Sequence, residues 1–334
     1  MKCNNIRGII QSAHNGIPVV RLLFGSYEAD ICPAMGANCI RFARNGMNVL
    51  RTPPSLDTFK SQPNVFGMPL LFPPNRIQGG VFMFQGRVYR FPVNEPSRGH
   101  HIHGFLSSTP FLAADLTVQA DGVCASFAVS FDALTPYLSF PHAFSVCLGY
   151  RLDDSGLTQT LTLMNQSTQS MPAGLGFHTA FLVPFVSDTT GEEYRLFAKV
   201  GEEICLDPAT ILPTGETLQA SVIGKALRVG TLIPAGRPLS HHFGGRTGEI
   251  TLTHVHTGAT VHYIPDPFFS FLMLWNNKGQ SGFVCPEPQS WQVDAPNSPL
   301  PPEKSGFHVL GPGESMRLDN KLHIDPGKAQ ATFS

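Results

Sequence analysis

Hydrophobic residues in this chain recur mostly at every second position, in short runs that end at glycine, proline, asparagine or aspartate. The clearest runs cover residues 19–24, 86–91, 125–131, 157–164, 249–255 and 259–263. A period of two is typical of half-buried antiparallel strands, in which alternate side chains face a core. No apolar stripe with helical spacing extends beyond about three turns, because proline and glycine would interrupt it.

Short strands with frequent turns predict an all-β protein, specifically a large antiparallel β-sandwich. No repeat or low-complexity tract is evident. The proline-rich stretch 296–302 is followed by the strand-like residues 307–310, so it is interpreted as a surface loop rather than a linker. We therefore predict a single domain over residues 1–334.

The charge balance limits the classes of partner. Lys and Arg number 23 and Asp and Glu 24, which gives a net charge of -1 and no basic surface for nucleic acid or an anionic membrane. Charged residues make up 14% and hydrophobic residues 42% of the chain, a balance typical of folded rather than disordered proteins. We expect a small-molecule ligand, no nucleic acid and no membrane partner.

Residues 1–7 lack the apolar core of a signal peptide, and the apolar run 268–275 is too short to span a bilayer. The 7 cysteines are irregularly spaced and form no CxxC pair, which argues against a disulfide scaffold or a zinc knuckle. We expect reduced thiols in a cytoplasmic protein.

Three regions carry side chains suited to chemistry. Arg76 follows an apolar run and two prolines, and its planar guanidinium suits sugar hydroxyls or a carboxylate, although a surface ion pair is the simpler explanation. His178 lies among glycines and apolar residues, where it is either a core histidine or a general acid. Glu287 stands between two prolines that hold its backbone extended, which favours a fixed carboxylate over a solvated one.

Histidine pairs raise the alternative of a metal site. His101 and His103 would share one face of a strand, and so would His254 and His256. Neither pair has further ligands at matching positions, so we predict no metal site.

Taken together, these regions resemble the aldose 1-epimerase (galactose mutarotase) family. The matching stretches are residues 36–40, 46–50, 69–77, 80–82, 86–89, 103–105, 174–178, 285–289 and 310–314, in the same order along nearly the whole chain. The resemblance implies a sandwich of antiparallel strands with a sugar in an open cleft, and no metal or organic cofactor.

By position, Glu287 resembles the family's general base and His178 its general acid. His103 and Arg76 resemble the residues that hold the sugar near the reacting ring, and the resemblance places Asn75 beside them. Together they would open and reclose the ring of an aldose, interconverting its α and β anomers.

One departure concerns the sugar. Sugar-specific members place an Asp before a Phe in the region of residues 240–243, whereas here His241 takes that place. We therefore expect His241 to contact the substrate and the usual sugar preference to differ. A hexose-6-phosphate 1-epimerase remains an alternative, with Arg41, Arg44, Arg51, Arg87, Arg90 and Arg98 as possible phosphate ligands. A non-catalytic sugar-binding or sensing module is another. We expect a monomer or a weak dimer.

Overall fold

The structure, a computed structural model, describes residues 6–132 and 134–328. Its largest element is an eight-stranded antiparallel sheet, called here the long sheet. In spatial order its strands are β11 (Leu112–Gln119), β12 (Gly122–Phe131), β13 (Phe144–Asp153), β14 (Gly156–Asn165), β27 (Ser315–Asp325), β23 (Thr260–Ile264), β22 (Thr247–His254) and β18 (Tyr194–Lys199). Burial alternates residue by residue along β13 and β14, so one face of this sheet is turned to the core.

A second sheet, called here the site sheet, carries the residues of interest. Its strands are β20 (Pro213–Leu218), β19 (Glu203–Leu206), β21 (Ser240–Phe243), β24 (Phe271–Trp275), β25 (Phe283–Gln289), β16 (Gly176–Phe177) and β6 (Leu70–Leu71), with β17 (Phe181–Leu182) also pairing with β25. It packs on the long sheet through contacts such as the Phe181 and Tyr263 rings, whose centroids are 5.8 Å apart.

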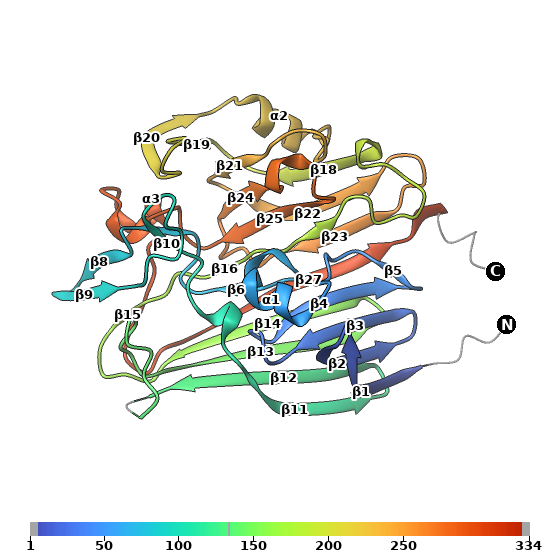
Figure 1. The fold of residues 1–334 in the computed structure, drawn as a ribbon, viewed down its shortest axis with the longest axis horizontal. Coiled ribbons are helices and arrows are strands. Elements are labelled where there is room, and N and C mark those ends of the chain that lie inside the picture. Colours follow the sequence, from blue (N-terminus) through green and yellow to red (C-terminus); the bar gives the residue numbers. More distant parts are fainter. Residues whose placement is uncertain (1–5, 133, 329–334) are drawn as a thin grey trace.

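A five-stranded N-terminal sheet covers the other end of the long sheet, with β2 and β3 contacting β12 and β13. Its strands are β1 (Arg7–His14), β2 (Ile17–Phe24), β3 (Tyr27–Cys32), β4 (Asn38–Arg44) and β5 (Met47–Asn48). Figure 1 shows these strands in blue near one edge of the long sheet and strands β19, β21, β24 and β25, in yellow to orange, near the other. One long sheet thus packs against two shorter ones.

Short elements complete the fold. Three small pairs are β7 (Arg76–Gln78) with β10 (His100–Ile102), β8 (Val81–Phe84) with β9 (Arg87–Arg90), and β15 (Met171–Pro172) with β26 (Val309–Leu310). The α-helices are α1 (Leu56–Ser61), α2 (Val222–Arg228) and α3 (Pro302–Ser305). The 3₁₀ turns are η1 (Pro63–Val65), η2 (Leu106–Ser108), η3 (Gly191–Glu193), η4 (Asn277–Gly279) and η5 (Ala295–Asn297).

The predicted all-β sandwich is confirmed, and every alternating run predicted as a strand lies on one, with ends that differ by at most three residues. The main hydrophobic core includes residues from Val20 to Ile324. The single domain over 1–334 stays a prediction, and residues 1–5, 133 and 329–334 lie outside the described part. The six cysteines within that part are free thiols, and Cys3 lies outside it. Among the described residues, no helix is long and apolar enough to cross a membrane.

Candidate active site

A cavity of about 510 Å³ opens over the site sheet. Its floor is formed by Glu287 on β25, Met273 and Trp275 on the neighbouring strand β24, and His178. Its walls and rim come from loops and short elements: residues 61–65, Asn75, Arg76, Asn94, Glu95, Arg98, Ile102, His103, Ile211 and Ser240. The volume is in the range of small-molecule sites.

The prolines around Glu287 fit a gap in the sheet. Strand β25 pairs with β24 from Cys285 to Gln289, but on its other side it pairs with β16 and β17 only near its two ends. The N–H of Ser290 points to that other side, where it donates to the carbonyl oxygen of Leu175 at 2.8 Å. Because alternate residues point the same way, Pro286 and Pro288 face this gap, where their missing N–H groups are not needed.

The gap brings His178 to Glu287. His178 follows β16, and its backbone N–H donates to the Pro69 carbonyl at 3.1 Å. Gly176 allows its backbone to pack closely against Pro74 and Gln289, because a Cβ there would lie 3.0 Å from the Pro74 side chain and 3.1 Å from the Gln289 side chain. As a result, Nε2 of His178 lies 3.1 Å from Oε1 of Glu287.

Both side chains are nearly removed from water. His178 is 4% exposed and Glu287 is 2% exposed. Burial lowers the pKa of His178 to about 4, and the positive charge of Arg51 also lowers it. Burial raises the pKa of Glu287 well above its usual value, while the charge of Arg76 and a hydrogen bond from Gln289 act in the opposite direction.

His103 and Asn75 stand together at the end of the β7–β10 pair. Both have left-handed backbones, with φ of 66° and 57°, and the N–H of His103 donates to the Asn75 carbonyl at 3.0 Å. The His103 ring lies edge-on to His178, with the ring centroids 5.1 Å apart. Nδ2 of Asn75 donates to Gln289, and Nε2 of Gln289 donates to Oε2 of Glu287, each at 3.2 Å. The predicted residues Glu287, His178, His103 and Asn75 therefore form one connected cluster.

Arg76 lines the cavity but its guanidinium is already engaged. Nε and one terminal nitrogen donate to the two oxygens of Glu95 at 2.7 and 2.8 Å, and Arg98 donates to the same carboxylate at 2.9 Å. Burial alone would raise the pKa of Glu95, but the two arginines together lower it. This wall of the cavity holds two cations against one anion.

The family model for aldose 1-epimerase matches residues 19–323. The chain belongs to the aldose 1-epimerase family. The chain is similar to the uncharacterized protein YihR of Escherichia coli (strain K12), with 28% identity over 234 residues, which cover 67% of this chain and 70% of that protein.

The chain is also similar to solved structures. A galactose mutarotase-like protein from Clostridium acetobutylicum has a TM-score of 0.92 and 29% identity, covering 96% of this chain and 99% of its own. A galactose 1-epimerase from Lactobacillus acidophilus NCFM has a TM-score of 0.70 at 15% identity, covering 96% of this chain and 99% of its own. The second likeness shows the fold alone.

The structure does not bring His241 to the cavity with the other predicted residues. On strand β21 it is Ser240 that lines the cavity, and His241 points to the opposite face of the sheet, where its Nδ1 lies 2.7 Å from Oε1 of Glu203. The residue that this strand presents to the cavity is therefore a serine.

Several cavity residues were not anticipated. Trp275 ended an apolar run and lies against His178, with ring centroids 5.6 Å apart. Glu95 and Ile211 lie in loops without a pattern that would mark them. Of the six arginines considered for phosphate, Arg98 alone is among the described residues that line the cavity.

Three of the cavity residues could also hold a metal ion, because ligand atoms of His103, His178 and Glu287 lie within 4.8 Å of one another. A ligating histidine usually anchors its second ring nitrogen to a carbonyl or carboxylate. Within the described residues, the Nδ1 atoms of His103 and His178 are buried and have no hydrogen-bond partner. The outer support expected of a metal centre is thus not built here, and the absence of a metal stays a prediction.

Proposed function

We propose that this protein is an aldose 1-epimerase that interconverts the α and β anomers of a free sugar. The observation that carries the proposal is the contact of 3.1 Å between His178 and Glu287 on the floor of a sugar-sized cavity. Family membership supports the same reaction class.

The reaction needs two proton transfers at neighbouring oxygens. Opening the ring removes a proton from the C1 hydroxyl and delivers one to the ring oxygen O5, as the C1–O5 bond breaks. Both oxygens are bonded to C1, so an acid and a base in mutual contact can reach both. Glu287 would accept the first proton and His178 would donate the second.

The open-chain aldehyde then rotates about its C1–C2 bond. Closure on the other face reverses both transfers, as O5 attacks C1, its proton returns to His178, and the Glu287 proton returns to the carbonyl oxygen. The pair holds one proton to share at the start and at the end, so no co-reactant is consumed. Each positioned acid or base typically contributes about 10²–10⁴-fold.

The protonation of the pair must suit this cycle. Burial favours the uncharged form, with the proton on Glu287 and a neutral His178. The Gln289 hydrogen bond and the nearby Arg76 favour the carboxylate that acts as a base. We infer that these groups keep the ion-pair form accessible, so that Glu287 can accept a proton from the sugar while His178 donates one to it.

His103, Asn75 and Arg76 would hold the sugar. His103 lies edge-on to the acid, and Arg76 is fixed by both oxygens of Glu95, so each presents a polar edge in a set position. Fixed partners orient the substrate before reaction, which lowers the barrier without new chemistry.

The proposal is tested by following the optical rotation of freshly dissolved α-glucose, α-galactose and other aldoses with the purified protein. Glu287→Gln should reduce the catalysed rate by at least about 100-fold while sugar binding persists. A chelator should leave the rate unchanged. If no sugar reacts faster with the wild-type protein although one binds, the non-catalytic sugar-binding module becomes the better account.

A sugar phosphate is a second candidate substrate, favoured by one observation. Arg76 and Arg98 share the single carboxylate Glu95, which leaves a surplus positive charge on that wall. Anomer exchange of glucose 6-phosphate, followed by exchange NMR, tests it directly. Arg98→Gln should slow the phosphorylated sugar more than the free one if the phosphate binds there.

A further inference from the structure

Arg51 has a setting that the proposed chemistry does not use. Its guanidinium lies between two aromatic rings, with Cζ 4.3 Å from the ring centroid of Phe66 and 4.0 Å from that of Phe283. Its Nη1 donates to the carbonyl oxygen of Val65 at 2.9 Å. Within the described residues no carboxylate pairs with Arg51, so ion pairing does not explain a half-buried cation here.

The two sides that Arg51 joins belong to different parts of the cavity. Val65 is the last residue of the wall segment 61–65, all of which lines the cavity. Phe283 lies on β25, on the same face as Glu287, and packs against Trp275 with ring centroids 5.7 Å apart. The backbone N–H of Arg51 also donates at 2.8 Å to Ala180, two residues beyond His178.

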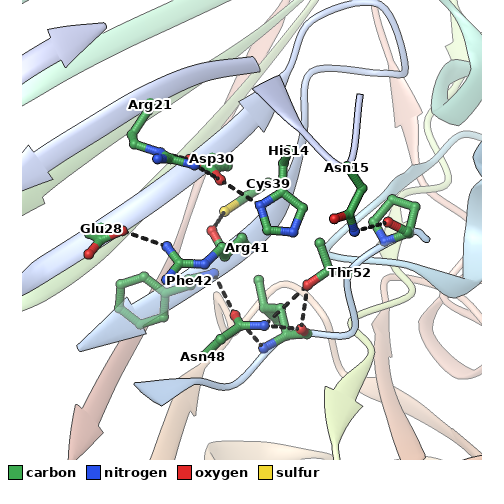
Figure 2. Close-up of polar contacts among 12 residues, drawn as sticks. His14, Asn15, Arg21, Glu28, Asp30, Cys39, Arg41, Phe42, Asn48 and Thr52 are labelled. Atoms are coloured by element: carbon green, nitrogen blue, oxygen red, sulfur yellow. Dashed lines mark hydrogen bonds and ion pairs between the residues drawn. The ribbon is translucent and has the colours of Figure 1, made fainter. Parts of the chain in front are cut away.

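The backbone that presents Arg51 is itself anchored on both sides. Nδ2 of Asn48 donates to the Leu50 carbonyl at 2.8 Å and lies 3.1 Å from the Thr52 hydroxyl, while Nδ2 of Asn15 donates to the Pro53 carbonyl at 2.9 Å. Figure 2 shows the Asn48, Thr52 and Asn15 contacts beside the N-terminal sheet. The side chain of Arg51 therefore projects from a fixed base.

We propose that Arg51 is a positioning residue for the substrate, which fastens the wall segment 61–65 to the floor strand β25 and so sets the width of the cavity. A planar guanidinium can stack on rings through its faces while donating from its edge, and a lysine ammonium cannot do both. This inference rests on the proposed sugar site, but it concerns the wall rather than the acid and base.

The test compares three variants in the anomerisation assay, with Arg51→Met as the main one. Its KM for the best aldose should rise about tenfold, the factor expected for a lost contact. The change in kcat should be smaller than the change in KM, and it reflects the loss of the Arg51 charge, which lowers the pKa of His178. Arg51→Lys keeps the charge and should raise KM to an intermediate value. If Arg51→Met does not fold, Arg51→Lys carries the test alone.

Arg44→Met is the matched control. Arg44 also lies over a ring, 5.2 Å from the centroid of Tyr27, and donates to a backbone carbonyl, that of Ile324 at 2.7 Å, but it does not line the cavity. Its removal should leave KM unchanged. An unchanged KM in both Arg51 variants, or an equal rise in Arg44→Met, would overturn the proposal. Failure of the wild-type protein to act on any sugar would instead count against the proposed function.

Discussion

The floor and the rim of the cavity are built from different kinds of structure. The floor residues Glu287, Met273 and Trp275 lie on two adjacent strands, where Met273 is the ladder partner of Glu287. The rim comes from separate loops, including residues 61–65, the turn with Glu95 and Arg98, and Ile211. Strand register fixes the relative positions of the floor side chains, whereas each loop can change in sequence or length without disturbing the hydrogen bonds between the strands.

This difference separates the proposed catalytic residues from the residues that would select the substrate. The proposed acid and base sit on the buried floor, where burial shifts the pKa values of both side chains. The residues that would sense the identity of the sugar sit on the partly exposed rim. The comparison predicts that floor substitutions change turnover and that rim substitutions change substrate preference.

The largest effect should come from His178. His178→Asn should lower kcat by about 10²–10⁴-fold, because it removes the proposed acid from the floor. His242→Asn is a control of the same type, since His242 is also fully buried on the site sheet but is not among the described residues lining the cavity. The two folded variants are compared by the kcat values that the optical-rotation assay gives. Similar losses in both would mean that general packing, not acid catalysis, explains the His178 effect.

The second prediction concerns stability against pH. Burial lowers the pKa of His242 and of His178 to about 4. Between pH 6.5 and 4 these histidines bind protons in the unfolded chain but stay neutral in the folded protein. Their contribution to the free energy of unfolding is therefore fully present above pH 6.5 and is lost as pH falls through this window. Each such histidine contributes up to about 1.4 kcal/mol per pH unit.

Glu287 acts with the opposite sign, because its raised pKa makes the folded state hold a proton that the unfolded state releases as pH rises. Glu287 and His178 therefore offset one another, whereas His242 adds to the loss of stability at low pH, as does His142, whose pKa burial also lowers to about 4. His242→Gln should flatten the dependence of unfolding free energy on pH, measured with urea at pH 7 and 5. An equally steep dependence in His242→Gln would mean that His242 does not contribute to the loss of stability at low pH.

The third prediction tests which residue of β21 meets the sugar. Ser240→Asp places a carboxylate at the cavity and should change the ratio of kcat/KM between glucose and galactose by about tenfold, since paired hydroxyls are strong discriminators. His241→Asn should leave the ratio unchanged, because His241 faces Glu203 on the other side of the sheet. A change in ratio with His241→Asn alone would restore the expectation drawn from the sequence.

This case also shows what the sequence could and could not predict. Alternation located the strands, because burial on one face imposes a period of two. On the four-residue strand β21, however, the first three residues are polar or ionisable, so alternation cannot set the register. His241 was therefore expected at the cavity, where Ser240 lies. Glu287 and His178 were proposed from resemblance and chemistry, but their contact depends on the gap beside β25, which no local sequence pattern indicates. Arg51 and Ile211 act through tertiary contacts that spacing along the chain does not reveal.

The smallest effect should come from Ile211 on the rim. Its φ of 58° lies in the left-handed region, which is unfavourable for a β-branched residue. The preceding turn holds the Ile211 backbone there, because Oδ1 of Asp207 accepts hydrogen bonds from the N–H groups of Ala209 and Thr210. Asparagine tolerates this backbone, so Ile211→Asn should leave the protein as stable or up to about 1 kcal/mol more stable. It also removes an apolar group from the rim, and KM should rise about threefold with kcat unchanged. Urea unfolding and the anomerisation assay measure the two effects separately. A fall in stability together with an unchanged KM would mean that the Ile211 side chain packs between the paired strands β19 and β20 and does not contact the sugar.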